Sequence, residues 1–440
     1  MRLATPPAIR RLQRTLYDAA KQEPARRFHQ LYDKVYRDDI LGHAYALVRA
    51  NGGAPGVDGV TCADIEAQGL EEWLAGLKEV LRTKTYTPDP VRRVQIPKRG
   101  GGERPLGIPT IRDRVVQTAV KLVLEPIFEA DFETTAYGYR PGRSAQDAVR
   151  TVHEAVCMGY TDVVDVDLTK YFDTIPHGAL LQSVARRIVD RAMLTLIKGW
   201  LQVVVEERDE DGKWRRTGGK QSRSGTPQGG VISPLLANIY MHRFLRTWRE
   251  RGKGTQFRAR LINYADDVVI LSRGYATPAL AWTRWAMGQL GLTLNERKTS
   301  IRQASRERFT FLGYAFGPMV YRKTGRPYLG AQPAQQSIRQ VKERVRAILH
   351  PGNQAPWEEI AAQVNRTTRG WATYFSYGTR QLAYRAVEAY VAERARHFLR
   401  RRHKLIGQGM RRFSGRTIFG PLGIARLGPR QGSSPVWAVA

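Results

Sequence analysis

The spacing of apolar side chains changes along the chain, and each change predicts a change of secondary structure. In residues 1–50 apolar positions recur at helical intervals with basic residues between them, which predicts a helical segment. Glycines and a proline at 51–61 predict a loop, and 65–81 returns to a helical pattern. From Val91 the chain is β-rich on both sides of a glycine-rich turn at 100–102, which predicts a hairpin.

Helical and extended patterns alternate through the middle of the chain. Ser233 followed by Pro234 predicts an N-cap with proline at the first helical position. The buried stripe of that helix is predicted at every fourth residue: Leu236, Tyr240, Phe244 and Trp248. The other predicted elements are helices at 113–129, 180–201, 278–290 and from about 335 to 405, strands at 161–168 and 309–316, and hairpins at 206–224 and 261–271.

These elements predict an α+β fold in four segments. A helical N-terminal extension covers 1–85, a mixed unit 86–330, a helical unit 331–405 and a basic appendix 406–440. The composition changes sharply near the end, because no Asp or Glu follows Glu393 while arginines continue.

The net charge of the chain indicates which class of molecule it binds. The 71 Lys and Arg residues against 40 Asp and Glu give a formal net charge of +31, which attracts polyanions. The 19 Tyr, 13 Phe and 9 Trp residues lie among the cations, and bases stack on such rings, so nucleic acid is the favoured partner. A solvated basic surface without a specific partner is the alternative.

Cysteine and hydropathy patterns indicate where the protein works. Cys62 and Cys157 have no metal-ligand spacing and are too few for a disulfide framework. No apolar run approaches the ~20 residues of a membrane-spanning helix, and the basic N-terminus lacks the apolar core of a signal peptide. We therefore expect a reducing, cytoplasmic compartment and no membrane partner.

Carboxylates in two strand-like segments are the strongest chemical signal. In TDVVDVDL, alternation places Asp167 at the end of a strand, and in LINYADDVVIL a short turn projects Asp266 and Asp267 from a hairpin. If the two elements are neighbours, the three side chains can share Mg²⁺ ions, which prefer a few carboxylates plus substrate phosphates. Two such ions would support phosphoryl transfer, with Mn²⁺ as a possible substitute. An Asp-Asp pair can also be a plain hairpin turn.

The order and wording of the motifs resemble the reverse transcriptases of group II introns over 51–313. YADD at 264–267 resembles motif C and DLTKYFDTIPH at 167–177 resembles motif A, which implies that Asp167, Asp266 and Asp267 bind the catalytic metals. SGTPQGGVISPLLANIYM at 224–241 is the most specific match, and YGYRPGRSAQDAV at 137–149 matches a further family motif. The resemblance implies a right-hand polymerase, with fingers and an antiparallel palm sheet at 86–330 and a thumb after it.

The same resemblance implies roles for residues around the metals. Lys98 and Arg104 of a fingers hairpin, Phe172 and Gln228 are expected to bind the deoxynucleoside triphosphate. Phe172 would exclude a 2′-hydroxyl, although a core aromatic is the alternative, and a Lys and Arg on a hairpin are often only solvated. Lys298 is expected beside the leaving pyrophosphate as a general acid. Template and primer contacts are expected at Gly229 and at the primer-grip residues Phe311, Leu312 and Gly313.

Segments of the C-terminal third resemble the maturase (X) region, which binds group II intron RNA during splicing. They are RGWATYFSYG at 369–378, LRRRHK at 399–404 and RRFSGRTIFGPLGIARL at 411–427. The expected RNA-binding residues are Arg400, Arg401, Arg402, Lys404, Arg411 and Arg412. A packed thumb with a solvated basic face is the alternative, and spacing favours a core position for Trp371 and Phe375. No Cys/His cluster of an HNH nuclease is present, so endonuclease activity is not expected.

The sequence thus predicts an RNA-directed DNA polymerase that also acts as a splicing maturase and supports intron mobility. Its expected partners are intron RNA, template RNA, a DNA primer or target, and deoxynucleoside triphosphates, in a bacterial ribonucleoprotein or at the nucleoid. The alternatives are a domesticated reverse transcriptase in phage defence or CRISPR adaptation, a non-catalytic RNA-binding splicing factor, and an RNA-dependent RNA polymerase. The sequence does not distinguish a monomer from a dimer.

Overall fold

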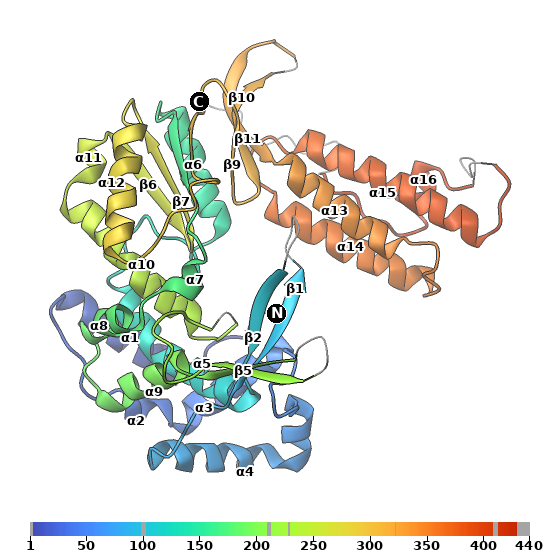
Figure 1. Ribbon diagram of the computed structural model, residues 1–440. Coiled ribbons are helices and arrows are strands. Elements are labelled where there is room, and N and C mark those ends of the chain that lie inside the picture. The colour runs from blue at the N-terminus through green and yellow to red at the C-terminus, as the bar shows by residue number, and fades with distance from the viewer. Residues whose placement is uncertain are drawn as a thin grey trace. The chain divides into compact units, whose positions relative to one another are not determined.

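The computed structural model of the 440-residue chain divides it into two compact units (Figure 1). One unit contains 1–144, 165–270 and 277–300, and the other contains 145–164, 271–276 and 301–440. The structure describes residues 3–97, 103–208, 213–227, 229–321, 323–407 and 412–428, without the side chains of Arg104 and Trp214.

Helices from the N-terminal third pack around α5 in the first unit. Helix α5 (Ile111–Glu129) is buried along most of its length, including several polar side chains, and it packs against α1 (Pro7–Gln22), α2 (Tyr32–Val35) and α3 (Asp38–Asn51). Helix α4 (Cys62–Arg82) packs on α3 and bends at Gly69. A capping box starts α4, because the Thr61 hydroxyl accepts from the Asp64 amide and the Asp64 carboxylate accepts from the Thr61 amide.

The predicted fingers hairpin is part of a four-stranded sheet of order β2-β1-β4-β5. Strands β1 (Val91–Pro97) and β2 (Glu103–Ile108) are antiparallel, with Arg92 opposite Ile108. The charged excursion after residue 203 forms β4 (Val204–Arg208) and β5 (Trp214–Gly218), and β4 runs parallel to β1. Both predicted hairpins are therefore confirmed.

The helix predicted at 180–201 is wrong as a single element. The structure has α8 (His177–Ala185) and α9 (Arg191–Leu201) instead. Between them, backbone hydrogen bonds join Arg187 and Val189 to Phe28 at 2.7 and 3.0 Å, so the chain leaves the helix to form a short bridge. Asp190 then caps α9 through the amides of Ala192 and Met193. A long-range contact has overridden the local pattern.

Helix α10 (Ser233–Glu250) has the predicted buried stripe, but its predicted cap is wrong. The Ser233 hydroxyl donates to the carbonyl of Pro227 at 2.8 Å and caps no helical amide. Beside α10 lie the short α11 (Lys253–Gln256) and α12 (Ala276–Gln289), where Trp248 and Trp282 contact each other edge to face.

The sheet that carries the acidic motifs has the order β6-β7-β3-β8. Its strands are β6 (Ala259–Tyr264), β7 (Asp267–Ser272), β3 (Asp162–Val166) and β8 (Ser300–Gln303). The apolar residues of β3 and β7 are almost completely buried, which fixes the register and leaves the strand ends to present polar groups.

The second unit combines a three-stranded sheet with a helical bundle. The sheet, of order β11-β10-β9, contains β9 (Phe309–Phe311), β10 (Tyr314–Val320) and β11 (Pro327–Pro333), and it packs on α6 (Ala145–Cys157). The bundle contains α13 (Gln335–Ile348), α14 (Trp357–Tyr374), α15 (Gln381–Arg402) and the short α16 (Gly415–Ile418) around one apolar core. Among the described residues, no helix is long and apolar enough to cross a membrane.

Candidate active site

Asp167 lies one residue beyond β3 and is fixed through its backbone. Its amide donates to the Thr299 hydroxyl at 3.3 Å, and its carbonyl accepts from the amide of Asn295 at 2.8 Å. These bonds tie the end of β3 to the segment before β8. The Asp167 side chain remains 37% exposed, so the carboxylate can reach a ligand while the backbone holds its position.

The turn that carries Asp266 and Asp267 depends on the buried Asn263. Ala265 has a φ of 58°, which is unusual for a residue with a Cβ. Asn263 is 1% exposed, and its side-chain amide donates to the carbonyls of Ala265 at 2.8 Å and Asp267 at 3.3 Å. One side chain thus closes the turn from inside, which fixes the direction of both carboxylates.

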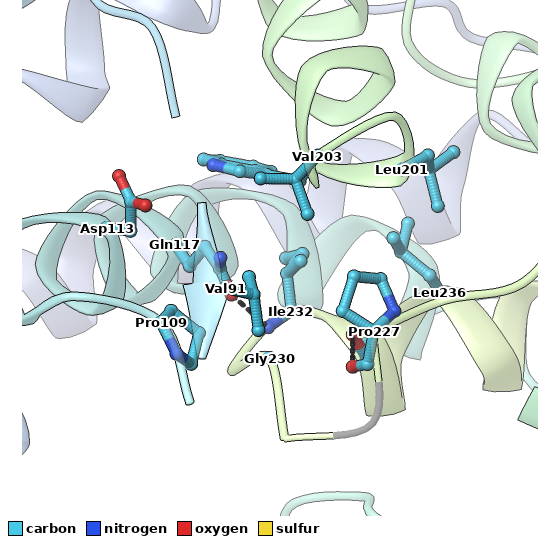
Figure 2. A pocket seen from close by; sticks show the side chains of 12 residues that line it. Val91, Pro109, Asp113, Gln117, Leu201, Val203, Pro227, Gly230, Ile232 and Leu236 are labelled. Atoms are coloured by element: carbon cyan, nitrogen blue, oxygen red, sulfur yellow. Dashed lines mark hydrogen bonds between the residues drawn. The ribbon is translucent and has the colours of Figure 1, made fainter. Parts of the chain in front are cut away.

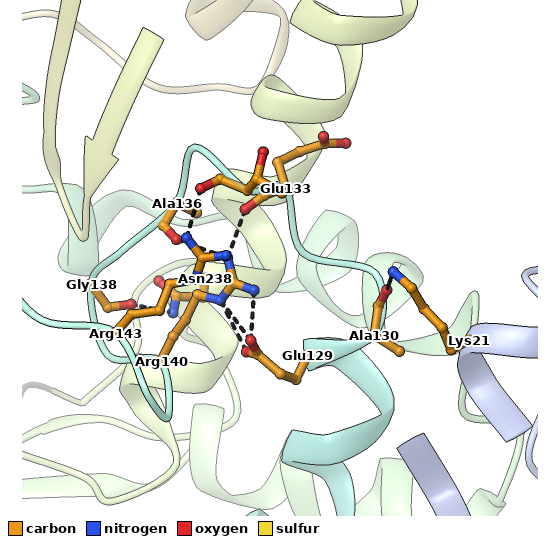
Figure 3. Close-up of polar contacts among 10 residues, drawn as sticks. Lys21, Glu129, Ala130, Glu133, Ala136, Gly138, Arg140, Arg143 and Asn238 are labelled. Atoms are coloured by element: carbon orange, nitrogen blue, oxygen red, sulfur yellow. Dashed lines mark hydrogen bonds and ion pairs between the residues drawn. The ribbon is translucent and has the colours of Figure 1, made fainter. Parts of the chain in front are cut away.

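A second layer of contacts supports this turn from the loop at 134–144 (Figure 3). A Cβ at Gly138 would clash with the backbone of Ala265, so only glycine allows this close approach. The Asn238 side chain of α10 donates to the Gly138 carbonyl at 2.8 Å. Arg140, whose side chain is 3% exposed, forms a forked ion pair with Glu129 and donates to two loop carbonyls, which pins the loop to α5.

Electrostatic effects place Asp266 near the motif that begins with Asp167. The pKa of the Tyr171 hydroxyl is raised well above its usual value, first by burial and also by the nearby charges of Tyr240 and Asp266. Tyr171 belongs to the short helix α7 (Tyr171–Thr174) that follows Asp167, and its hydroxyl donates to the Ala237 carbonyl. Burial and the Asp267 carboxylate likewise raise the pKa of Tyr264. Strands β3 and β7 are neighbours in the sheet, so this effect agrees with Asp266, in the turn before β7, lying near the segment that follows β3.

Lys298 lies beside Asp167, with 3.9 Å between Nζ and Oδ2. The Lys298 side chain is 69% exposed, so the contact is loose and leaves the ammonium group able to meet a ligand. The Lys298 amide donates to the carbonyl of Asn295, the same residue whose amide holds Asp167. One turn thus positions both side chains.

The donor set fits magnesium as an open site. Within the described ranges, no three or more His, Cys, Asp or Glu side chains form a ready-made cage. Mg²⁺ often binds through only one or two carboxylates together with waters and substrate phosphates, and Asp167 and Asp266 are both partly exposed carboxylates that would be able to contribute in that way.

The loop before α10 packs against both the fingers sheet and motif A. A Cβ at Gly229 would clash with the Gly107 carbonyl of β2, and the Thr226 amide donates to the Phe172 carbonyl at 2.7 Å. Phe172 itself is half-buried and makes edge contacts with the rings of Tyr139 and Tyr171. The loop before α10 therefore contacts β2 at Gly229 and the backbone of Phe172 at Thr226, which brings two of the expected site residues to the same loop.

A small cavity of about 10 Å³ lies behind this loop (Figure 2). Val91, Gln117 and Leu236 are among its lining residues. The Gln117 side-chain oxygen accepts from the Ile232 amide at 3.4 Å, while the Ser233 hydroxyl holds the Pro227 carbonyl. These two contacts connect the loop to α5 and α10.

Several expected ligand contacts cannot be placed. Lys98, Gln228 and Arg411 lie outside the described residues, and for Arg104 only the backbone is described, opposite Ile96 in the hairpin.

In the second unit, the strand predicted at 309–316 is wrong as one element, because it turns at Leu312 and Gly313 to form β9 and β10. The Leu312 carbonyl accepts from the Tyr374 hydroxyl and the Gly313 carbonyl from the Ser337 hydroxyl, each at 2.9 Å. Phe311 is 4% exposed, so its side chain belongs to the core. The turn, rather than the Phe311 ring, is the accessible part of the expected primer grip.

The basic residues at the end of α15 differ in their roles. Arg400 donates to the Gly407 carbonyl at 2.9 Å and Arg402 to the Ala355 carbonyl at 2.8 Å, so both hold local structure. Arg401 and Lys404 are exposed, and Arg412 is exposed with its guanidinium near the Phe413 ring. Trp371 and Phe375 have ring centroids 5.0 Å apart, and Phe375 is 5% exposed.

Sequence reasoning missed the residues that support the acidic turn. The roles of Asn238 and Arg140 depend on contacts between separate elements, whereas Asn263 bonds only to its own turn. The signals were present, since Asn263 directly precedes YADD and Arg140 lies within YGYRPGR.

Comparisons with known proteins assign this arrangement to a class. Residues 96–316 match the family described as reverse transcriptase (RNA-dependent DNA polymerase), and 338–414 match the group II intron maturase-specific domain. The chain therefore belongs to the reverse transcriptase family and is an RNA-directed DNA polymerase of the group II intron type. The expected α+β, right-hand polymerase fold is confirmed.

Two curated relatives show how far the similarity extends. Protein YkfC of Escherichia coli is 36% identical over 343 residues, which are 70% of this chain and 87% of that protein. The group II intron-encoded protein LtrA of Lactococcus lactis is 38% identical over 217 residues, which are 49% of this chain but 34% of that protein. A solved telomerase from Candida albicans covers 77% of this chain and 65% of its own at 10% identity and a TM-score of 0.42, which is too low to support an argument.

Proposed function

We propose that Asp167, Asp266 and Asp267 form the centre at which this reverse transcriptase joins a deoxynucleotide to a primer. The observation that carries the proposal is that β3, which ends one residue before Asp167, and β7, which begins at Asp267, are neighbouring strands of one sheet. When bound there, a pair of Mg²⁺ ions, or Mn²⁺ in their place, would activate the primer hydroxyl and neutralise the triphosphate.

The surrounding residues are proposed to orient the substrates. Asn263 and Gly138 hold the acidic turn, and Thr226 connects the loop before α10 to Phe172. We propose that the Phe172 ring excludes a ribose 2′-hydroxyl and that Lys298 gives a proton to the leaving pyrophosphate. The exposed position of Lys298 beside Asp167 supports the second role. Lys98, Arg104 and Gln228 are proposed triphosphate ligands on the family resemblance alone.

We further propose that the protein binds its group II intron RNA as a maturase and supports intron mobility in the bacterial cytoplasm. The matched maturase-specific domain at 338–414 and the exposed Arg401, Lys404 and Arg412 support an RNA contact there. The four segments 1–85, 86–330, 331–405 and 406–440 remain a prediction of functional modules, which the division into compact units does not address.

Primer extension on poly(rA) with oligo(dT) tests the polymerase centre. Asp266→Ala should lower DNA synthesis at least about a thousandfold, because a metal ligand is lost, while RNA affinity should stay within about twofold. Asp173→Ala is the matched control, since it removes a carboxylate six residues after Asp167 that is not an expected ligand. Wild-type synthesis by Asp266→Ala would refute the assignment, and equal loss in both variants would reduce it to a structural role.

A further inference from the structure

A groove of about 630 Å³ in the first unit contains none of the polymerase residues described above. It is formed by the end of α1, the segment at 24–27, the end of α5, the region around the end of α8, and α10. Its cationic lining residues are Lys21, Arg27, Arg186, Arg187, Arg243, Arg246 and Arg249, against the two carboxylates of Asp131 and Glu250.

Internal ion pairs account for part of this charge. Arg187 is 4% exposed and makes two bonds to Asp131, at 2.7 and 2.5 Å, which fix the wall of the groove. Arg246 pairs with Glu250 at 2.7 Å, and Arg249 pairs with Glu133 at 2.8 Å. The carboxylates of the groove are therefore already engaged by neighbouring cations.

Three arginines of the groove form no ion pair with any carboxylate of the described residues. They are Arg27, Arg186 and Arg243. Arg27 and Arg186 are exposed, and the Arg243 guanidinium lies over the ring of Tyr240, which leaves its edge able to donate. Guanidinium groups in this state match phosphate oxygens in geometry and charge.

A histidine in the groove wall adds a directional group. The Nδ1 atom of His242 is buried and has no hydrogen-bond partner among the described residues, although a buried polar atom normally has one. Burial lowers the pKa of His242, which favours a neutral ring that can donate from one nitrogen.

We propose that this basic groove binds the sugar-phosphate backbone of RNA, as a contact separate from the polymerase centre. The volume far exceeds the ~10–15 Å³ that one water needs, so there is room for more than a single small anion. The choice of RNA over another polyanion rests on the proposed maturase function and on the net charge of +31. Figure 3 shows one edge of the groove, where Lys21 donates to the Ala130 carbonyl.

A triple variant, Arg27→Gln with Arg186→Gln and Arg243→Gln, tests the groove in the full chain. The probe is a stem-loop RNA of about 60 nucleotides, and its Kd is measured at several salt concentrations. Loss of up to three phosphate contacts should reduce the slope of log Kd against log salt by about 2 to 3 and weaken binding about tenfold or more. Primer extension on poly(rA) and oligo(dT) should stay near wild type, which separates this test from that of the polymerase centre.

The matched control is Arg11→Gln with Arg14→Gln and Arg82→Gln, which removes the same charge from exposed positions outside the groove. Its salt slope should fall by less than about 1. Equal effects of the two triple variants would overturn the proposal, because they would show only the effect of net charge. An unchanged slope in the groove variant would also overturn it, and would point instead to an acidic protein as the occupant.

Amine footprinting of the wild-type protein gives a readout without substitutions. Lys21 lines the groove, whereas Lys78 lies on α4 and pairs with Asp38. The RNA should slow acylation of Lys21 at least about threefold and leave Lys78 unchanged, and 1 M salt should abolish the protection by screening the charges. Protection of neither lysine, or of both to the same degree, would contradict a specific groove contact.

Discussion

At the scale of single residues, the turn that carries the proposed catalytic carboxylates depends on one uncharged side chain. Asn263 satisfies two carbonyls of the turn that carries Asp266 and Asp267, and Ala265 holds a left-handed conformation within it. A left-handed residue with a side chain costs about 1–3 kcal/mol and persists only where its surroundings enforce it. The two hydrogen bonds of Asn263 therefore stabilise the conformation of this turn, in addition to the packing that any buried side chain provides.

We predict that Asn263→Ala lowers the primer-extension rate about 10- to 100-fold and raises the Mg²⁺ concentration needed for half-maximal rate. Two turn carbonyls lose their donor, at a cost of about 1–3 kcal/mol each, and the carboxylates are no longer held in position. Rates measured across a magnesium titration give both values. Added magnesium should not restore the activity of Asp266→Ala, whereas it should restore part of the activity of Asn263→Ala.

Thr283→Ala is the control for a lost buried hydrogen bond elsewhere in the same unit. Thr283 is fully buried in α12 and donates to the Ala279 carbonyl at 2.8 Å. It should lower the unfolding temperature without changing the magnesium dependence. The positioning role of Asn263 fails if both variants show the same magnesium curve.

At the scale of elements, a buried carboxylate joins the N-terminus of α5 to its neighbours. Asp113 accepts from the Tyr86 hydroxyl at 2.6 Å and the Asp89 amide at 3.0 Å, and Trp200 of α9 donates to the Tyr86 oxygen. Burial raises the pKa of Asp113 to about 6, with a smaller increase from Asp89 and an opposing decrease from the Tyr86 hydrogen bond. The folded state therefore holds a proton more tightly than the unfolded chain.

This higher pKa predicts that Asp113 stabilises the fold less as the pH rises. The contribution is complete below pH 3.8, the ordinary pKa, and is lost as the pH passes about 6. The loss is about 3 kcal/mol, because each tenfold change in proton affinity corresponds to about 1.4 kcal/mol. Relative to the wild type, Asp113→Asn should thus gain stability between pH 4.5 and 7, as measured by unfolding temperature. In Tyr86→Phe the hydrogen bond that lowers the pKa of Asp113 is lost, so the pH at which Asp113 ceases to stabilise the fold should be higher than in the wild type. Parallel curves of unfolding temperature against pH for Asp113→Asn and the wild type would contradict this account.

Elements also show what the sequence could predict. Periodicity located α4, α5, α12 and the three predicted hairpins, because burial of one face leaves a regular pattern in the residues. It failed at 186–190 and at Leu312, where the chain changes direction inside a segment that was predicted as one element. At 186–190 the cause is pairing with Phe28, and at Leu312 it is the hydroxyls of Tyr374 and Ser337. These partners are distant in sequence, so no local pattern could reveal them.

The candidate site likewise contains residues that the sequence predicted and residues that it did not. The acidic motifs were found because their residue types and spacing carry the chemistry directly. Asn238 and Arg140 were missed because their side chains join separate elements, α10 to the loop at 134–144 and that loop to α5. Asn263 was missed although its bonds are local, to residues two and four positions further along the same turn, because nothing in its residue type marks it as the donor that closes the turn.

At the scale of the whole molecule, the described parts of both compact units contain cationic residues that form no ion pair with a described carboxylate. The groove arginines belong to the first unit, and Arg401 belongs to the second, where it is exposed at the end of α15. Arg402 differs from Arg401, because its bonds to the carbonyls of Ala355 and Gln354 make it part of the bundle. Arg401→Ala therefore tests RNA binding, whereas Arg402→Ala also tests stability.

If both surfaces bind one RNA, the length of that RNA should decide how their losses combine. A long RNA that reaches both surfaces makes the second contact intramolecular, so that removing either surface weakens binding strongly. We predict that the groove triple variant and Arg401→Ala each raise the Kd of a long intron RNA about tenfold and that the losses multiply when combined. With an RNA short enough to occupy only one surface at a time, for which a stem-loop of about 20 nucleotides is the first probe, each loss alone should be about twofold or less. Filter binding at one fixed salt concentration measures the Kd of each RNA for the wild type, the groove triple variant, Arg401→Ala and the combined variant.

Arg402→Ala is the matched control, and it should lower the unfolding temperature but change the Kd less than Arg401→Ala does. If the ratio of variant Kd to wild-type Kd is the same for the long and the short RNA, the two surfaces act separately. Their effects would then be explained by net charge and not by one RNA that contacts both.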